Sequence, residues 1–166
     1  RSLRIARYKS GKYTIERPLH LGAVMARPSA TEHSELLNVL SAYGLPLGEA
    51  FQLRDDLLGI FGDPETTGKP AGDDLREGKV TLPLIAAMQR GTPEQTQLIK
   101  NAVENGSIEQ LSEVVSIVRS TGALDITHQY ASLEAQRAID AARTLPNNPF
   151  TESLIMLGSQ LLRRKY

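Results

Sequence analysis

Acids and lysines gather around one short glycine-rich link between Phe51 and Thr81, and this stretch is the best equipped for chemistry. Four of its residues follow one another at helical spacing, so on a helix they would share one face. They are Gln52, Asp55, Asp56 and Gly59. That face therefore carries two adjacent carboxylates.

Two neighbouring carboxylates need a counter-charge. At about 4 Å apart they repel each other by roughly 4 kcal/mol at an effective dielectric of 20. A divalent cation with oxygen ligands would offset this repulsion, and Lys69 and Lys79 further along indicate an anion near the same place. The sequence therefore predicts a magnesium-bound phosphate or diphosphate as the simplest partner of Asp55 and Asp56.

An acid pair on a helix is more often a solvated face than a binding site. Here the flanking residues are strongly apolar, which predicts a mostly buried helix whose carboxylates point into a cleft. These flanking residues are Phe51, Leu53, Leu57, Leu58, Ile60 and Phe61. A phosphate-binding P-loop is excluded because Pro70 follows Lys69 where Ser or Thr is needed. An EF-hand is disfavoured because Asp74 stands where that loop has a bidentate Glu.

Composition bounds the class of protein. The 166 residues are enough for one domain with a real core, and 19 basic residues balance 19 acidic ones, so no bulk charge draws the chain to nucleic acid or anionic membrane. There is no cysteine, hence no disulfide or thiolate metal site. Without a long apolar run, we expect a soluble, cytoplasmic protein with no integral membrane segment. The first residue is Arg1 and not Met, so we expect the chain to be a piece of a longer one.

Apolar residues recur at helical spacing almost throughout, which predicts an all-α fold in a single domain over residues 1–166. We expect a capping box at Ser29 and Glu32, and a kink or brief break at Gly44 and Pro46. Residues 62–78 are expected to form a loop. Further helices are expected from Thr81 to Arg90, from Thr92 to Gly106, from Ser107 to Gly122, from Ala123 to Thr144 and from Phe150 to Arg163.

The acidic stretch resembles a known family. FQLRDDLLGIFGD followed by TGKPAGDDLREGKVTLP is similar to the second aspartate-rich region of the trans-isoprenyl diphosphate synthases, the geranylgeranyl and longer polyprenyl diphosphate synthases in particular. Upstream, YKSGKY resembles the lysine-Thr/Ser segment of that family. By itself this upstream segment is typical of a solvent-facing helix end.

The resemblance implies the C-terminal part of an isoprenoid-synthase-type helical bundle. It also implies a prenyltransferase that condenses isopentenyl diphosphate with an allylic diphosphate by magnesium-assisted ionisation. Asp55 and Asp56 would hold magnesium and act in catalysis, with Asp74 in the outer shell of the metal. The residues that would bind the diphosphate substrates are Lys9, Ser10, Gln52, Lys69 and Lys79.

Two departures from the family matter. Gly59 stands where the second motif often has a third aspartate, so one potential magnesium ligand is missing. The first aspartate-rich motif should lie upstream of Lys9, and residues 1–8 do not supply it. The chain therefore resembles the C-terminal half of such an enzyme, which we expect to be inactive alone and to expose apolar surface that favours a homo-oligomer. The alternative is a non-catalytic helical partner subunit of a prenyltransferase. A terpene cyclase is disfavoured by the GKPAGDDL and GKVT blocks.

Overall fold

The computed structural model describes residues 2–26, 33–62 and 72–163, and these contain helices and no strand. They fall into two compact units. Unit 1 takes Leu3–Gln52 and continues from Ala131 to the C-terminal helix, and unit 2 takes Leu53–Tyr130. The all-α expectation is confirmed. The capping box expected at Ser29 and Glu32 lies outside the described residues.

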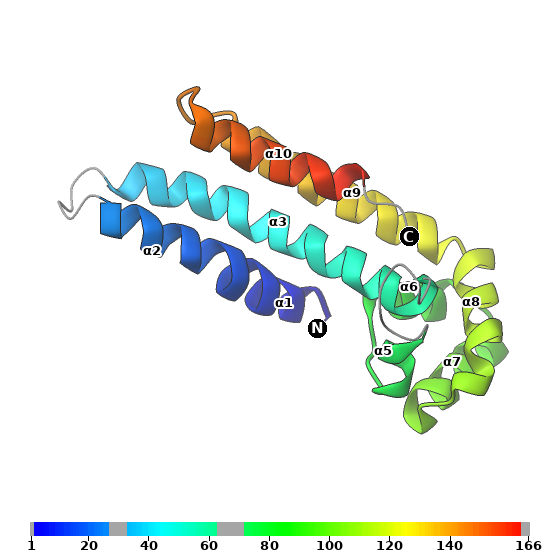
Figure 1. The fold of residues 1–166 in the computed structure, drawn as a ribbon. Helices are drawn as coiled ribbons and strands as arrows, with labels where there is room; N and C mark the ends of the chain where they lie inside the picture. The colour runs from blue at the N-terminus through cyan, green and yellow to red at the C-terminus, as the bar shows by residue number, and fades with distance from the viewer. Residues whose placement is uncertain (1, 27–32, 63–71, 164–166) are drawn as a thin grey trace. The chain divides into compact units, whose positions relative to one another are not determined.

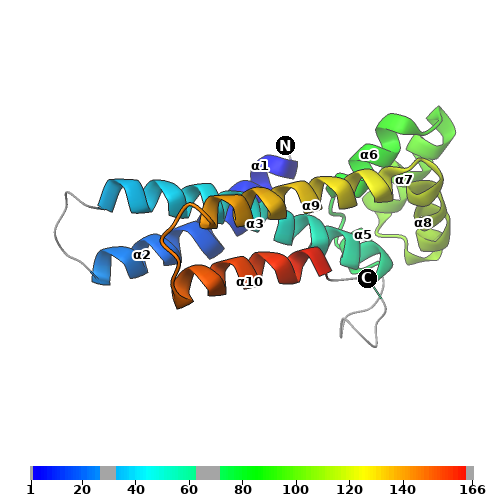
Figure 2. The ribbon, with the colours of Figure 1, turned by 90° about the horizontal axis from the view of Figure 1, so that it is seen from above.

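Unit 1 is built from long helices. A nearly continuous run of α1 (Ser2–Ala6), η1 (Arg7–Glu16) and α2 (Arg17–Ala26) lies beside the first part of α3 (His33–Phe61). The rest of the unit is most of α9 (Ala123–Ala142) together with α10 (Pro149–Arg163). Figures 1 and 2 show α2, α3, α9 and α10 running side by side.

The core of unit 1 joins α3 to α9 and α10. Leucines from α3 and α10 pack against a row of small residues on α9, which lets the helices approach closely. Fully buried Tyr43 anchors this core, because its hydroxyl donates a hydrogen bond to the Leu154 carbonyl at 3.0 Å. The buried members are Leu40, Tyr43, Leu47, Ala50, Ala135, Ala138, Ala142, Leu154 and Leu161.

The helix α3 runs without interruption through Gly44 and Pro46, so the expected break is wrong. Packing against η1 explains the glycine: a Cβ on Gly44 would lie 3.0 Å from the Glu16 Cα. Gly48 is tighter still, since its Cβ would come within 2.6 Å of the Ser10 carbonyl carbon. Glycine is thus required where two backbones meet, and it does not end the helix.

Unit 2 is made of shorter helices. Besides the end of α3 and the first turns of α9, it contains α5 (Asp73–Arg76), α6 (Leu82–Arg90), α7 (Pro93–Asn105), η2 (Ile108–Gln110) and α8 (Leu111–Ser120). Its core is a second apolar cluster that includes Ile60, Leu75, Leu84, Ile99, Val114 and Val118. Within the expected loop over residues 62–78 the structure has α5, so that expectation is wrong for Asp73–Arg76.

Helix ends were predicted in unit 2 at Thr81, Thr92 and Gly106, and the structure can be compared with each. Thr92 accepts a hydrogen bond from the Gln95 N–H and Gln95 bonds back to Thr92, which confirms a helix start with a full capping box. Gly106 ends α7 with a left-handed φ of 59°. Thr81 stands at the start of α6 as expected, but its hydroxyl makes no cap hydrogen bond.

Candidate functional site

The acid pair lies on the part of α3 that belongs to unit 2, and its two members differ in exposure. Asp55 is exposed, whereas Asp56 is 7% exposed. An exposed carboxylate keeps its oxygens accessible to a ligand from solution, while a buried one must be satisfied by protein groups. Asp55 is therefore the better placed of the two to meet a ligand.

A further acidic residue of this region, Asp74, lies in the short helix α5. It is 9% exposed, and its Oδ1 accepts a hydrogen bond from the Lys79 Nζ at 2.9 Å. The backbone closes the same small turn, since the Lys79 N–H donates to the Asp74 carbonyl at 2.9 Å. The pairing is thus held by both side chain and main chain.

Lys79 serves two acids at once. Its Nζ lies 2.9 Å from Asp74 Oδ1 and 2.6 Å from Glu77 Oε2. These contacts, with Glu77 first and Asp74 second, raise the pKa of the Lys79 ammonium above its usual range. About half of the Lys79 side chain remains exposed.

Gly59, where the resembled motif often has a third aspartate, is in direct contact with Asp74. A Cβ built on Gly59 would lie 2.6 Å from the Asp74 Cγ and closer still to Oδ2, so a side chain at position 59 would require the Asp74 carboxylate to move. The Gly72 N–H also donates to the Gly59 carbonyl at 3.0 Å, which ties the start of α5 to this point of α3. This contact could not be predicted from the sequence, because the two residues are fifteen positions apart.

The donor set suits magnesium. In proteins this ion is commonly held by one or two carboxylates, with waters and substrate phosphates completing its shell. Asp55, Asp56 and Asp74 carry hard oxygen donors of this kind, and of the three only Asp55 is exposed. Among the described residues no three acidic, histidine or cysteine side chains are gathered into a metal cluster. A small number of protein ligands is nonetheless what a magnesium diphosphate requires.

The predicted substrate residues of unit 1 lie where η1 crosses α3. Ser10 is buried and donates a hydrogen bond to Gln52 Oε1 at 2.7 Å, so two residues that sequence reasoning linked only by family resemblance are in contact. Lys9 precedes them and is exposed. η1 is a π-helix, a form that is frequent at functional sites and here brings its backbone against Gly48. Lys69 lies outside the described residues.

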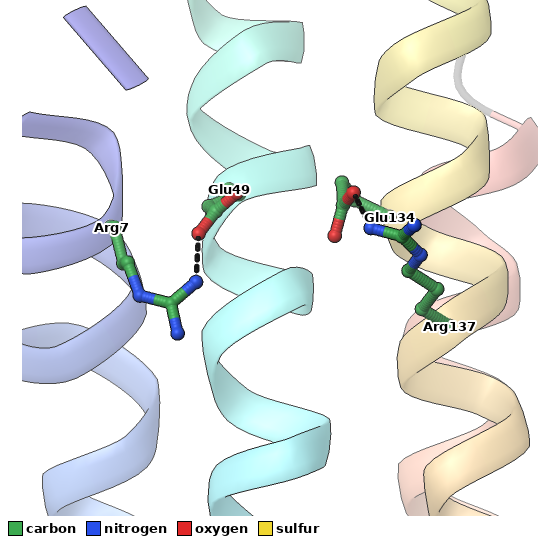
Figure 3. A network of polar contacts seen from close by, with 4 residues as sticks. All are labelled: Arg7, Glu49, Glu134 and Arg137. Atoms are coloured by element: carbon green, nitrogen blue, oxygen red, sulfur yellow. Dashed lines mark hydrogen bonds and ion pairs between the residues drawn. The ribbon is translucent and has the colours of Figure 1, made fainter. Parts of the chain in front are cut away.

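Unit 1 also contains a polar network that the sequence analysis did not single out (Figure 3). Buried Glu49 on α3 accepts a hydrogen bond from Arg7 at 3.0 Å, and buried Glu134 on α9 accepts one from Arg137 at 2.6 Å. Burial raises the pKa of the Glu134 carboxyl; Arg137 opposes this shift and the nearby charge of Glu49 adds to it. The available signal was an acid inside an apolar stretch, Leu47-Gly-Glu-Ala50.

No helix in the part of the chain that the structure describes combines the length and the apolar character needed to cross a bilayer.

Comparison with solved structures defines the class. The fold is that of the helical isoprenyl synthases: the chain is 38% identical, with a TM-score of 0.87, to a geranylgeranyl pyrophosphate synthase from Corynebacterium glutamicum complexed with isoprenyl diphosphate and magnesium. The alignment covers 99% of this chain and 46% of that one. A polyprenyl synthase from Caulobacter crescentus, complexed with calcium and isoprenyl diphosphate, is 35% identical with a TM-score of 0.85, over 99% of this chain and 49% of that one.

Sequence comparison gives the family. Residues 1–119 match Polyprenyl synthetase, and the chain belongs to that family. It is 48% identical over 126 residues to the octaprenyl diphosphate synthase of Escherichia coli, covering 75% of this chain and 39% of that protein. The chain therefore spans less than half the length of these relatives.

Proposed function

We propose that this chain supplies the C-terminal part of a trans-prenyltransferase that condenses isopentenyl diphosphate with an allylic diphosphate. The observation that carries the proposal is the arrangement in unit 2, where exposed Asp55 stands one helical turn before Gly59 and the Asp74–Lys79 pair rests on that glycine. Family membership adds a chemistry that requires acids and lysines of this kind.

In this proposal the chain's own residues hold and orient a charged leaving group. Asp55 and Asp56 act on the metal side, with Asp74 behind them. The substrate side is formed by Lys9, Ser10, Gln52, Lys69 and Lys79, which would contact diphosphate oxygens or line the adjoining pocket. Magnesium, when bound, would neutralise the charge that develops on the diphosphate as its bond to carbon breaks. Lysine ammonium groups contribute to the same end as point charges.

The chain alone should not turn over, because the first aspartate-rich motif of the resembled family lies upstream of the matching part. A further part of the proposal is association with a second copy of this chain. Three neighbouring side chains of α2, Leu21, Val24 and Met25, are exposed by 62%, 48% and 74%, and an apolar patch of this kind is typical of an interaction surface. A cytoplasmic location belongs to the same proposal, and the absence of cysteine is consistent with a reducing compartment.

The test uses the complete protein encoded by the parent open reading frame. We expect magnesium-dependent incorporation of labelled isopentenyl diphosphate into longer prenyl diphosphates, and an Asp-Asp-x-x-Asp segment upstream of this chain. A folded, complete protein that makes no such product would defeat the proposal. If the 166-residue chain gains activity only when mixed with a different polypeptide, the partner-subunit alternative is correct.

A further inference from the structure

Two buried acids of unit 1, Glu49 on α3 and Glu134 on α9, belong to one row of charged side chains. Figure 3 shows the row in the order Arg7, Glu49, Glu134, Arg137, so each acid has an arginine on one side and the other acid on the other side. The two acids are 6% and 4% exposed, whereas the side chains of the two arginines are 50% and 60% exposed. The acids are therefore out of water, while their counter-charges remain largely in it.

This difference in exposure weakens the compensation of the two negative charges. An ion pair gains little when water screens its cation. Two ionised carboxylates that face each other away from water also repel. Loss of one negative charge from the row would relieve that repulsion, and uptake of a proton by one carboxylate is the simplest way to remove a charge.

Glu134 is the acid better suited to hold this proton. Burial is the main cause that raises the pKa of its carboxyl; Arg137 opposes the shift, the charge of Glu49 adds to it, and the charge of Arg7 lowers it. The charged groups that act on Glu134 thus come from its own helix, from α3 and from η1. The residues that α10 adds to the core of unit 1 are apolar.

We propose that Glu49 and Glu134 act as a coupled carboxyl pair that takes up one proton from solvent, and that this proton joins α9 to α3. The proton resides on Glu134, whose O–H donates to the Glu49 carboxylate, and Glu49 also accepts from Arg7. A repulsive contact between two helices thereby becomes an attractive one. Arg137 can turn to solvent at small cost, because its side chain is already mostly exposed.

The pair is a pH-sensitive device that includes the first helical segment of unit 1. Arg7 is the first residue of η1, and its guanidinium reaches Glu49 at 3.0 Å. With the proton in place, hydrogen bonds run from η1 through α3 to α9. A fall in pH through the titration midpoint therefore tightens the packing of these three elements, whether or not a substrate is bound.

The midpoint is measured by nuclear magnetic resonance of the 166-residue chain with ¹³C-labelled glutamate side chains, where the Glu134 signal is the one missing in Glu134→Gln. We expect a midpoint above the ordinary value of about 4.5. Glu49→Gln should lower it by about one pH unit, because a like charge is lost. Arg7→Gln should raise it, because a positive charge is lost. The matched control is Asp140→Asn, which removes an exposed acid of α9 paired with Arg143 and should leave the midpoint unchanged.

Thermal unfolding tests whether the proton joins the helices. The melting temperature of Glu134→Gln should match that of the wild type below the midpoint and exceed it above the midpoint, because the amide resembles the protonated acid. When both chains also carry Glu49→Gln, the excess should be smaller and should begin at a lower pH, since the repulsion between the carboxylates is gone.

The outcomes decide the inference without magnesium or pyrophosphate, so they are independent of the proposed function. The same Glu134 midpoint in the wild type, Glu49→Gln and Arg7→Gln would overturn the inference, because burial alone would then act on Glu134. A wild-type midpoint at or below about 4.5 would reject it as well. If Glu49→Gln does not fold, Arg7→Gln decides the question at a half-exposed position, where an unchanged midpoint means that the charges are not coupled.

Discussion

The carboxylates of the two units are balanced in different ways. In unit 1, Glu49 and Glu134 are buried between helices and each has one arginine, at 3.0 and 2.6 Å (Figure 3). In unit 2, Asp74 and Glu77 share the single ammonium of Lys79, and exposed Asp55 stands nearby on α3. Each buried acid of unit 1 thus has its own arginine, whereas two acids of unit 2 share one ammonium group.

We infer that exposure and charge balance together separate structural acids from candidate ligand-binding acids in this chain. For a buried acid with a dedicated arginine, removing the arginine leaves a buried charge uncompensated. We expect an exposed acid such as Asp55 to affect ligand binding more than packing. We therefore expect substitutions in unit 2 to lower binding or turnover and substitutions in unit 1 to change stability.

The largest effect should come from Asp55→Asn in the complete protein. We expect turnover to fall by roughly a hundredfold or more, because an electrostatic contact with the leaving diphosphate is lost, while helicity by circular dichroism stays the same. Asp140→Asn is the matched control, since Asp140 is an exposed helical acid paired with Arg143. Unchanged turnover in Asp55→Asn would remove this residue from the site and erase the contrast between the units.

Lys69→Ala should act on binding and leave folding intact. Loss of one charge-assisted hydrogen bond of about 1.5 kcal/mol corresponds to roughly a tenfold weaker affinity for pyrophosphate in the presence of magnesium. Calorimetric titration measures the affinity and thermal unfolding measures the stability. A steep fall in melting temperature with unchanged affinity would mean that Lys69 has a structural role.

Arg7→Ala should show the opposite signature. Glu49 would remain buried without its partner, so the free energy of unfolding should fall by about 1 kcal/mol in urea. Arg143→Ala is the matched control: both members of its pair are 60% exposed, and loss of such a pair costs at most about 0.5 kcal/mol. Equal losses in the two variants would show that burial of the acid does not matter here.

The smallest effect is a change in pH dependence. Because burial raises the pKa of Glu134, the folded state holds its proton more tightly than the unfolded state does. The stability contributed by this group is fully present below its ordinary pKa of about 4.5 and is lost as the pH rises through the raised value. Glu134→Gln should therefore gain stability relative to the wild type across that pH window. A constant difference at all pH values would contradict the assigned cause.

Features that depend on neighbouring residues could be predicted from the sequence. The start of α7 depends on Thr92 and Gln95, which are three residues apart and satisfy each other, so neighbouring residues suffice to define it. The glycines at positions 44 and 48 of α3 lie instead against the backbone of η1, more than twenty residues away. Helix-breaking residues in a sequence cannot reveal that a second helix requires the absence of a side chain.

The same distinction, between features set by nearby residues and contacts between distant ones, applies to the candidate site. Asp55, Lys79 and the Ser10–Gln52 pair could be named from motifs, because family chemistry requires those residue types in that order. The contact between Asp74 and Gly59 could not be predicted from motifs, because it depends on how α5 packs against α3. Glu49 and Glu134 escaped notice for a related reason, since their partners come from a different helix or from the next helical turn.

The most direct test of the central claim is a calorimetric titration of pyrophosphate into this chain with and without magnesium. We predict binding that requires magnesium and is lost in Asp55→Asn, with Asp140→Asn behaving as the wild type does. Equal binding of pyrophosphate without magnesium, or an Asp55→Asn variant as tight as the wild type, would show that the acids of unit 2 hold no cation.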